Sequence, residues 1–206
     1  MKLYRHPFSS CSRRALLTVL ELGIASRVEL VTIELEKGAQ RAPSYLKLNP
    51  NGKVPVLEHD GLVLWESHAI MQYLADVTPG QTLLPADPRG RADVTRWMFW
   101  NAHHFTAGVS TLNREHMVKK LMGRGDPDPV EVERGEGLVK TFGAVLDAHL
   151  EGKQWICADR LTLADLSIAA ELASIERAKL PVGDFANLRA WFSRVSSRDS
   201  WRIANG

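Results

Sequence analysis

Three serine hydroxyls and one thiol lie close together near the start of the chain. The run, which follows an expected strand over 2–5 and opens an expected helix over 9–23, is Ser9-Ser10-Cys11-Ser12. In the simplest interpretation, one serine caps the helix and the others are solvated. A helix start also has unpaired N–H groups and the positive end of the helix dipole, which favour an anion. A hydroxyl beside them can donate a hydrogen bond to a thiolate, and the spacing alone leaves both interpretations open.

The energies involved are large enough for the second interpretation. Lowering a thiol pKa from about 8.5 to about 6.5 requires roughly 2.7 kcal/mol. A charge-assisted hydrogen bond supplies on the order of 1.5–3 kcal/mol, and a helix terminus adds about 0.3–1 kcal/mol. One hydroxyl at a helix start is therefore sufficient to activate the thiol of a bound ligand.

A second polar segment, Asn51-Gly52-Lys53-Val54-Pro55, is a loop that leads into an expected strand over 55–58. A proline that opens a strand stands where its missing N–H costs least. A cis Val54–Pro55 bond would turn the Val54 N–H and C=O outward, free to pair with an extended peptide. The sequence does not decide between the cis and trans forms.

The pair Glu66-Ser67 forms a third junction, between an expected strand over 62–65 and an expected helix over 67–77. As a structural interpretation, Ser67 caps that helix. As a functional one, the Ser67 hydroxyl and the N–H groups after it bind a carboxylate, while Glu66 accepts from an ammonium group. A free amino acid end carries both charges.

These three segments need a scaffold that places strand ends and helix starts together. The first 78 residues predict the order βαβαββα, with a second strand over 28–33 and a short helix over 43–48. Asp60-Gly61 between two apolar runs is a strong hairpin signal. We therefore expect a mixed α/β sheet whose last two strands are antiparallel.

The composition changes after a proline-rich connector over 79–88, and the remainder predicts helices only. They are expected over 89–121, 130–150, 163–175 and 188–195, and they indicate an all-α bundle over 89–206. The third is the best defined, because Thr162 and Asp165 form a capping box. Since it is apolar on most sides, we expect it to be the buried central helix of the bundle.

Composition excludes several other classes. A net charge of +2 with interspersed signs gives no basic face for nucleic acid. The only cysteines, Cys11 and Cys157, match no metal-ligand spacing. The apolar run after Arg14 is broken at Glu21, too early for a signal peptide or a membrane-spanning helix. We expect a cytoplasmic protein with no metal and no membrane partner.

Together, these motifs resemble the cytosolic glutathione transferase family over nearly the whole chain. Lys53-Val54-Pro55 is similar to its cis-proline loop, Glu66-Ser67 to its motif for the γ-glutamyl end of glutathione, and the box at Thr162–Asp165 to its C-terminal capping motif. Among the serine-dependent classes, the sequence looks most like the phi class of plants and its bacterial relatives. The resemblance implies a thioredoxin-like domain over 1–78, the linker 79–88, and a helical domain over 89–206 that contributes the hydrophobic substrate pocket.

The resemblance also implies roles for individual residues. Ser9 would stabilise the thiolate of glutathione, and the Val54 backbone would pair with its cysteinyl portion. The two ends of the tripeptide would be bound by polar and charged residues, namely Gln40, Arg41 and Lys53 at the glycyl end and Glu66 and Ser67 at the γ-glutamyl end.

The implied function is that of a glutathione transferase: a detoxifying enzyme, expected as a homodimer, that conjugates reduced glutathione to hydrophobic electrophiles. Glutathione is a cosubstrate, and no bound cofactor is implied. Ser9-Ser10-Cys11 also resembles the zeta class, which isomerises maleylacetoacetate, although Leu16 stands where that class has an arginine.

Several alternatives stay open at this stage. Peroxidase chemistry and a non-catalytic binding module are further interpretations of the same fold. Ser10 or Cys11 could contact the sulfur in place of Ser9. Of the polar pair His103 and His104, at most one can face the substrate pocket, and either His104 or Phe105 is the candidate.

Overall fold

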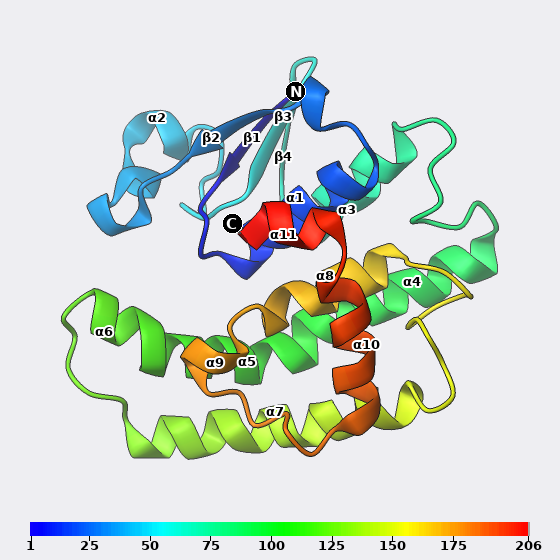
Figure 1. The fold of residues 1–206 in the computed structure, drawn as a ribbon. Helices are drawn as coiled ribbons and strands as arrows, with labels where there is room; N and C mark the ends of the chain where they lie inside the picture. The colour runs from blue at the N-terminus through cyan, green and yellow to red at the C-terminus, as the bar shows by residue number, and fades with distance from the viewer. Residues whose placement is uncertain (206) are drawn as a thin grey trace. The chain divides into compact units, whose positions relative to one another are not determined.

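The computed structural model describes residues 1–205, which form two compact units (Figure 1). Unit 1 comprises Met1–Leu84 together with the end of the chain from Arg198, and unit 2 comprises Pro85–Ser197. The expected helical domain ran to residue 206, whereas the chain from Arg198 groups with unit 1. None of the helices within residues 1–205 combines the length and apolar character that crossing a membrane requires.

Unit 1 contains a mixed sheet, as the sequence predicted. Its strands within residues 1–205 are β1 (Lys2–Arg5), β2 (Glu29–Thr32), β3 (Val56–His59) and β4 (Leu62–Trp65), in the spatial order β2-β1-β3-β4. The β1–β2 pair is parallel, and the β1–β3 and β3–β4 pairs are antiparallel. Asp60 and Gly61 both have positive φ, 48° and 84°, which is the conformation that the Asp-Gly hairpin signal predicts.

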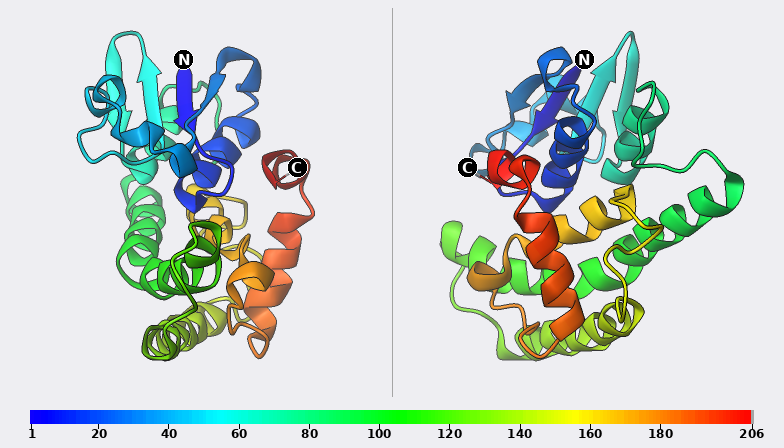
Figure 2. Two further views of the ribbon diagram at one scale, coloured as in Figure 1. Left: turned by 90° about the vertical axis from the view of Figure 1, so that its left-hand side faces the viewer. Right: turned by 45° about the vertical axis from the view of Figure 1, so that its right-hand side comes forward.

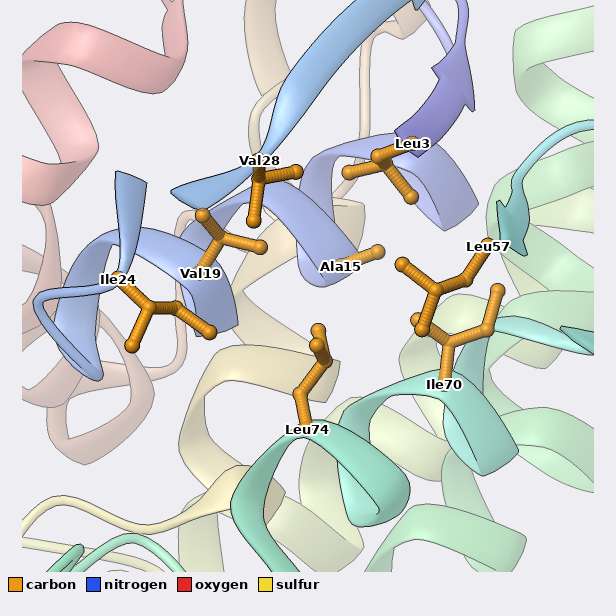
Figure 3. Close-up of a cluster of buried hydrophobic side chains, with 8 residues drawn as sticks. All are labelled: Leu3, Ala15, Val19, Ile24, Val28, Leu57, Ile70 and Leu74. Atoms are coloured by element: carbon orange, nitrogen blue, oxygen red, sulfur yellow. The ribbon is translucent and has the colours of Figure 1, made fainter. Parts of the chain in front are cut away.

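One face of this sheet is covered by α1 (Ser10–Glu21) and α3 (Ser67–Asp76). Figure 3 shows the resulting core, in which Leu3 and Leu57 of the sheet meet α1 and α3 side chains that include Ala15 and Leu74. The short helix α2 (Pro43–Leu46) and the 3-10 segments η1 (Ala25–Arg27), η2 (Leu35–Lys37) and η3 (Ala39–Arg41) complete the connections.

The regular elements of unit 2 within the described residues are all helices, as expected, but the long helix predicted over 89–121 is interrupted. Two π-helical segments, η4 (Asn101–Phe105) and η5 (Arg114–Val118), separate α4 (Pro88–Trp100), α5 (Thr106–Asn113) and α6 (Lys119–Leu121). A π-helical turn inserts an extra residue into the helical repeat, which periodicity of apolar residues does not reveal. The remaining helices are α7 (Pro129–His149), α8 (Leu163–Leu172), α9 (Ile175–Ala178) and α10 (Ala186–Ser196).

Helices α5 and α7 pack closely because glycines stand at their contact. A Cβ atom at Gly108 of α5 would lie 2.9 Å from the Val139 backbone nitrogen of α7, and one at Gly135 of α7 would lie 3.0 Å from Leu112 of α5. Helix α10 packs against both α7 and α8 (Figure 2). Small residues thus bring the longest helix of the unit close to the α4–α6 segment.

Helix α8 is the buried centre of unit 2, as predicted, and all of its residues are buried. The capping box is formed, with Thr162 as N-cap. Asp165 accepts from the backbone N–H of Thr162 at 2.8 Å and from its hydroxyl at 2.9 Å. It also accepts from Ile156 N at 3.0 Å and Trp191 Nε1 at 2.8 Å. The carboxylate therefore ties α8 to the preceding loop and to α10.

Helix α11 (Asp199–Asn205), which was not predicted from the sequence, packs against α1 within unit 1. Arg198 donates two hydrogen bonds to the Glu21 carboxylate, from Nε at 2.6 Å and from Nη2 at 2.7 Å. The Ser200 hydroxyl donates to the same carboxylate. A bidentate arginine–carboxylate pair is a strong and directional contact, so it orders the last residues of the described chain.

We predict that Asp165→Asn lowers the free energy of unfolding by about 1–3 kcal/mol, because an amide nitrogen would then face at least one N–H donor in a buried site. Urea denaturation monitored by tryptophan fluorescence measures the change. Asp159→Asn, at an exposed position of the same loop region, is the matched control and is expected to change stability by less than about 0.5 kcal/mol. Equal effects of the two changes would contradict the assigned role of Asp165.

Candidate functional site

The sheet register brings the separate polar segments of the sequence to one edge. Arg5 is paired with Thr32, and Val56 is paired with both Tyr4 and Trp65. The ends of β1, β2 and β4 and the start of β3 therefore lie side by side. Consequently the segments that leave or enter these strands, 6–9, 33–41, 53–55 and 66–67, all project from the same end of the sheet.

Ser9 is the N-cap of α1, with φ −81° and ψ 120°. Its hydroxyl oxygen accepts a hydrogen bond from Ser12 N at 3.2 Å. A serine hydroxyl has one donor and two acceptor lone pairs, and within residues 1–205 the Ser9 hydrogen has no acceptor. The side chain is only partly buried. Ser9 is thus a helix cap, as the structural interpretation held, and it still has a hydrogen that it can donate to a ligand.

The neighbours of Ser9 differ in what they have available. Ser12 is fully buried, and its hydroxyl accepts from His6 N at 3.2 Å, which fixes the loop between β1 and α1. Ser10 is the first residue of α1, and Cys11 is a free cysteine; both are partly exposed. Ser12 therefore has a structural role, whereas Ser10 and Cys11 stay accessible.

The loop before β3 presents an unpaired backbone unit. The Val54–Pro55 peptide bond is cis, the form that the sequence did not decide. Within residues 1–205, neither the N–H nor the C=O of Val54 has a hydrogen-bond partner. An unpaired backbone donor and acceptor on one residue can pair with an extended peptide, as an added strand does.

Gln40, Arg41 and Lys53 come from two loops that touch. Gly52 has φ +59°, and a Cβ atom there would lie 3.2 Å from the carbonyl oxygen of Gln40. The side chains of Arg41 and Lys53 are exposed. The Gln40 side-chain oxygen is buried without a hydrogen-bond partner within the described chain. The loops that carry the two cations therefore meet beside Val54, an arrangement suited to a carboxylate, whereas the buried Gln40 oxygen can only accept a hydrogen bond.

At the third junction, the position of the helix cap differs from the expected one. Glu66, not Ser67, occupies the N-cap position of α3, with φ 71° and without a side-chain capping bond. Ser67 is the first helical residue and is 5% exposed. A helix start whose N-cap side chain makes no capping bond favours an anion. Glu66 itself is exposed.

A side-chain hydrogen bond joins the two helices that begin at this edge. Arg14 of α1 lies 2.8 Å, through Nη1, from Nε2 of His68 in α3. Because arginine can only donate, His68 accepts here through Nε2. The contact lies one turn below the start of α1 and within the first turn of α3, so it fixes the two helix starts relative to each other.

The residues suggested in unit 2 do not form a comparable site. Phe105 is fully buried and stacks on Trp100, with 5.8 Å between ring centroids, so it belongs to the core rather than to a substrate pocket. His103 stacks on Phe99 and His104 packs against Phe142 of α7. Both histidines are exposed.

A cavity of about 640 Å³ lies within unit 2, among α4, the end of α7 and residues 152–159. Its polar groups largely satisfy one another: Arg96 pairs with Asp93, and His149 accepts from Lys153 at 3.3 Å and donates to Ile156 O at 2.8 Å. Burial lowers the pKa of His149. No group of three or more His, Cys, Asp or Glu side chains within residues 1–205 is arranged to hold a metal ion.

Two residues that shape the site, Tyr45 and Asn49, were not predicted from the sequence. Both donate hydrogen bonds of 2.8 Å to the Lys53 carbonyl oxygen. The Asn-Pro-Asn-Gly turn signal at 49–52 could have indicated Asn49, because asparagine side chains commonly bond to the backbone of the turns they open. Nothing in the local pattern pointed to Tyr45.

Comparison with known proteins agrees with this architecture. Residues 8–77 match the glutathione S-transferase N-terminal domain and residues 99–199 match the glutathione S-transferase C-terminal domain. The chain is 32% identical to glutathione S-transferase F10 of Arabidopsis thaliana, over 95% of this chain and 92% of the relative. It is 33% identical to glutathione S-transferase 3 of Zea mays, over 98% and 91%.

Other relatives extend beyond plants. The crystal structure of a glutathione S-transferase from Rhodospirillum rubrum has a TM-score of 0.88 at 32% identity, covering 98% of this chain and 90% of that one. FtsZ-localized protein A of Caulobacter vibrioides is 28% identical over 97% of this chain and 88% of the relative.

The first unit is thioredoxin-like and has backbone and charged groups that suit a small peptide, and the second unit is helical. This combination is typical of transferases that use glutathione. The chain belongs to the glutathione S-transferase family, and it is a transferase enzyme.

The tyrosines beside the site give a prediction of pH dependence. The Glu58 carboxylate, which accepts from the Tyr4 hydroxyl at 2.5 Å, raises the pKa of Tyr4 to about 12. Burial raises the pKa of Tyr45 to about 12. Both values lie above the unfolded value of 10.0. The contribution of these two tyrosines to the stability of the folded state is therefore present below pH 10 and is lost as the pH rises through about 12.

Ultraviolet titration of phenolate formation tests this. The folded protein is expected to ionise later than the urea-unfolded chain, and Tyr4→Phe is expected to remove about half of the difference between the two curves. Coincident curves for the folded and unfolded chains would contradict the assignment.

Proposed function

We propose that the enzyme activates glutathione at the start of α1 and conjugates its sulfur to hydrophobic electrophiles, as a detoxifying transferase. The observation that carries the proposal is the Ser9 hydroxyl. It caps the helix through its oxygen and keeps a free hydrogen at a helix N-terminus. A thiolate placed there would receive a charge-assisted hydrogen bond and the favourable end of the helix dipole.

In the proposed reaction, the bound thiol loses its proton to solvent and the thiolate attacks the electrophilic carbon. A new carbon–sulfur bond forms, and either a leaving group departs with its electron pair or a proton adds to the neighbouring atom. The nucleophile belongs to the cosubstrate, so no covalent bond to the protein is needed. Ser9 acts by stabilising negative charge on sulfur, which keeps the nucleophile ionised near neutral pH.

The other residues are proposed to bind the tripeptide. The Val54 N–H and C=O would pair with its cysteinyl portion. Gln40, Arg41 and Lys53 would receive the glycyl carboxylate. At the opposite end, the first turn of α3 from Ser67 would bind the γ-glutamyl carboxylate, while Glu66 would accept from its ammonium group. The electrophile is proposed to bind to apolar side chains of the helical unit.

Two other functions have specific support. The run Ser9-Ser10-Cys11 favours a glutathione-dependent isomerase or peroxidase as the second candidate, and a panel of maleylacetone, a hydroperoxide and a chloro-aromatic substrate would separate these reactions. The third candidate is a non-catalytic binding module, since the relative FtsZ-localized protein A is named for its location with another protein and not for a reaction. Calorimetry that detects no glutathione binding would favour that third candidate.

We also propose that the protein is a cytoplasmic homodimer. The edge strand β4 supports the dimer, because Leu62, Val63 and Trp65 are 41%, 38% and 39% exposed. Apolar side chains along an unpaired edge strand favour association unless something covers them. A second copy of the chain is the proposed cover. The two free cysteines are consistent with a reducing compartment.

For the catalytic proposal, we predict that Ser9→Ala lowers kcat for conjugation of a chloro-aromatic substrate about 10- to 100-fold near neutral pH, the value of one hydrogen bond to a charged group. The dissociation constant of glutathione, measured by calorimetry, is expected to change by less than about threefold, because the neutral thiol gains little from the hydroxyl. Ser10→Ala and Cys11→Ala serve as controls and are expected to retain activity. Unchanged turnover in Ser9→Ala, with a loss in either control, would transfer the role to that neighbour.

For the dimer, two chains of 23.0 kDa give about 46 kDa by light scattering. Val63→Arg is expected to shift the protein toward the monomer, because a desolvated charge would lie in the contact. Leu121→Arg, at a site 67% exposed on α6, is the control and is expected to leave the mass unchanged. A monomeric wild type would rule out the proposed state.

A further inference from the structure

The Lys53 carbonyl oxygen is held by two buried side chains at once. The Tyr45 hydroxyl and the Asn49 amide each donate to it at 2.8 Å. Tyr45 is 5% exposed and Asn49 is 3% exposed. We propose that Tyr45 and Asn49 are positioning residues, which aim the Val54 N–H at the backbone of the bound peptide. This inference rests on the proposed glutathione site.

The geometry of the peptide group links the direction of the Lys53 carbonyl to that of the Val54 N–H. Of the bonds in this loop, Val54–Pro55 is cis, whereas Lys53–Val54 is trans. In a planar trans peptide, the C=O and the N–H of the next residue point in opposite directions. When Tyr45 and Asn49 draw the Lys53 carbonyl inward, the Val54 N–H must point outward. That N–H has no partner within residues 1–205.

Asn49 is itself held in place from several directions. Its side-chain oxygen accepts from Asn51 N and from Asn51 Nδ2, each at 3.0 Å, and its backbone oxygen accepts from Gly52 N at 2.9 Å. Both the oxygen and the nitrogen of the Asn49 side chain thus make hydrogen bonds within the loop. The amide orientation is fixed, because a flipped amide would place NH2 against the Asn51 N–H.

Tyr45 joins the loop to the sheet. Its ring packs edge-on against that of Tyr4, with 6.1 Å between centroids. Tyr4 lies on β1 opposite Val56 and donates to Glu58 of β3. Side chains alternate along a strand, so Tyr4 lies on the face opposite Leu3 and the α1–α3 core. The position of the Val54 loop relative to the two central strands, β1 and β3, is therefore fixed by a series of aromatic and hydrogen-bond contacts.

This arrangement uses both lone pairs of one carbonyl and leaves a neighbouring donor unpaired. For stability alone, one donor to Lys53 O would satisfy the buried oxygen. The second donor instead restricts the rotation of the peptide plane. A preoriented N–H reduces the ordering that binding would otherwise require, so the effect should appear in glutathione affinity and hardly at all in the chemical step.

The test compares three variants that each remove defined polar groups. Tyr45→Phe removes one donor to Lys53 O. Asn49→Asp removes the other donor but keeps the acceptor for Asn51. Tyr73→Phe is the matched control, since the Tyr73 hydroxyl makes an equally short bond of 2.8 Å to His59 Nδ1, near the hairpin turn of the same unit. Glutathione binding is measured by calorimetry, turnover at saturating glutathione by a conjugation assay, and unfolding by urea.

We expect the dissociation constant for glutathione to rise about three- to tenfold in Tyr45→Phe, the equivalent of one hydrogen bond, and at least as much in Asn49→Asp. Turnover at saturating glutathione should change by less than about twofold, because Ser9 is untouched. For the same reason, the pH at which the bound thiol ionises should hardly change. Tyr73→Phe should bind glutathione as the wild type does. In ¹⁵N-labelled wild type, the Val54 amide signal should shift on addition of glutathione.

Three results would overturn the inference: equal affinity in Tyr45→Phe and Tyr73→Phe, a change confined to turnover, or a Val54 amide signal that glutathione does not move. If Asn49→Asp does not fold, Tyr45→Phe and the labelled wild type still decide the question. Absence of glutathione binding to the wild type is a different outcome, since it removes the proposed function itself.

Discussion

The position of β1, parallel to β2 on one side and antiparallel to β3 on the other, determines where all the proposed glutathione contacts can lie. Its register is fixed by the core, because Leu3 and Leu57 are directly paired and both face α1 and α3. A slip of one residue would turn Leu3 away from this core and bring Tyr4 into it. The edge at which four polar segments meet is therefore a consequence of hydrophobic packing several residues away.

At that edge the backbone supplies most of the chemistry. The helices α1 and α3 both begin there, and each presents N–H groups that its own turn cannot satisfy. Helix α1 is capped by the Ser9 side chain, whose hydroxyl hydrogen can still be donated. The cap position of α3 is occupied by Glu66, whose side chain makes no capping bond. The bond between Arg14 and His68 fixes the spacing of the two helix starts. A small peptide with anionic groups at suitable distances is the ligand that such an arrangement fits.

The helical unit uses its polar residues mainly to hold itself together. Asp165 satisfies four donors from three segments, and Asn101 of η4 bonds to Ser167 of α8 through both its backbone oxygen and its hydroxyl. In its cavity, Arg96 is neutralised by Asp93 and Lys153 donates to His149. Burial raises the pKa of the Cys157 thiol, which also lines that cavity, so this cysteine is a poor nucleophile. The residues proposed to bind and activate glutathione therefore all lie in unit 1.

By itself, the sequence determined the features that depend on neighbouring residues: the strand and helix order of unit 1, the Asp60-Gly61 turn, and the capping box at Thr162. It also predicted that α8 is buried, because its apolar residues surround the helix. Only the tertiary structure decided that Glu66 rather than Ser67 caps α3, that α4 to α6 are separated by π-helical turns, and that α11 belongs with α1. It also revealed Tyr45 and Asn49 as the residues that hold Lys53. The physical reason is the separation of the partners along the chain. Capping boxes and two-residue turns are closed by atoms a few residues apart. The Glu21–Arg198 pair and the Tyr4–Tyr45 contact join residues far apart in sequence, and only folding brings them together.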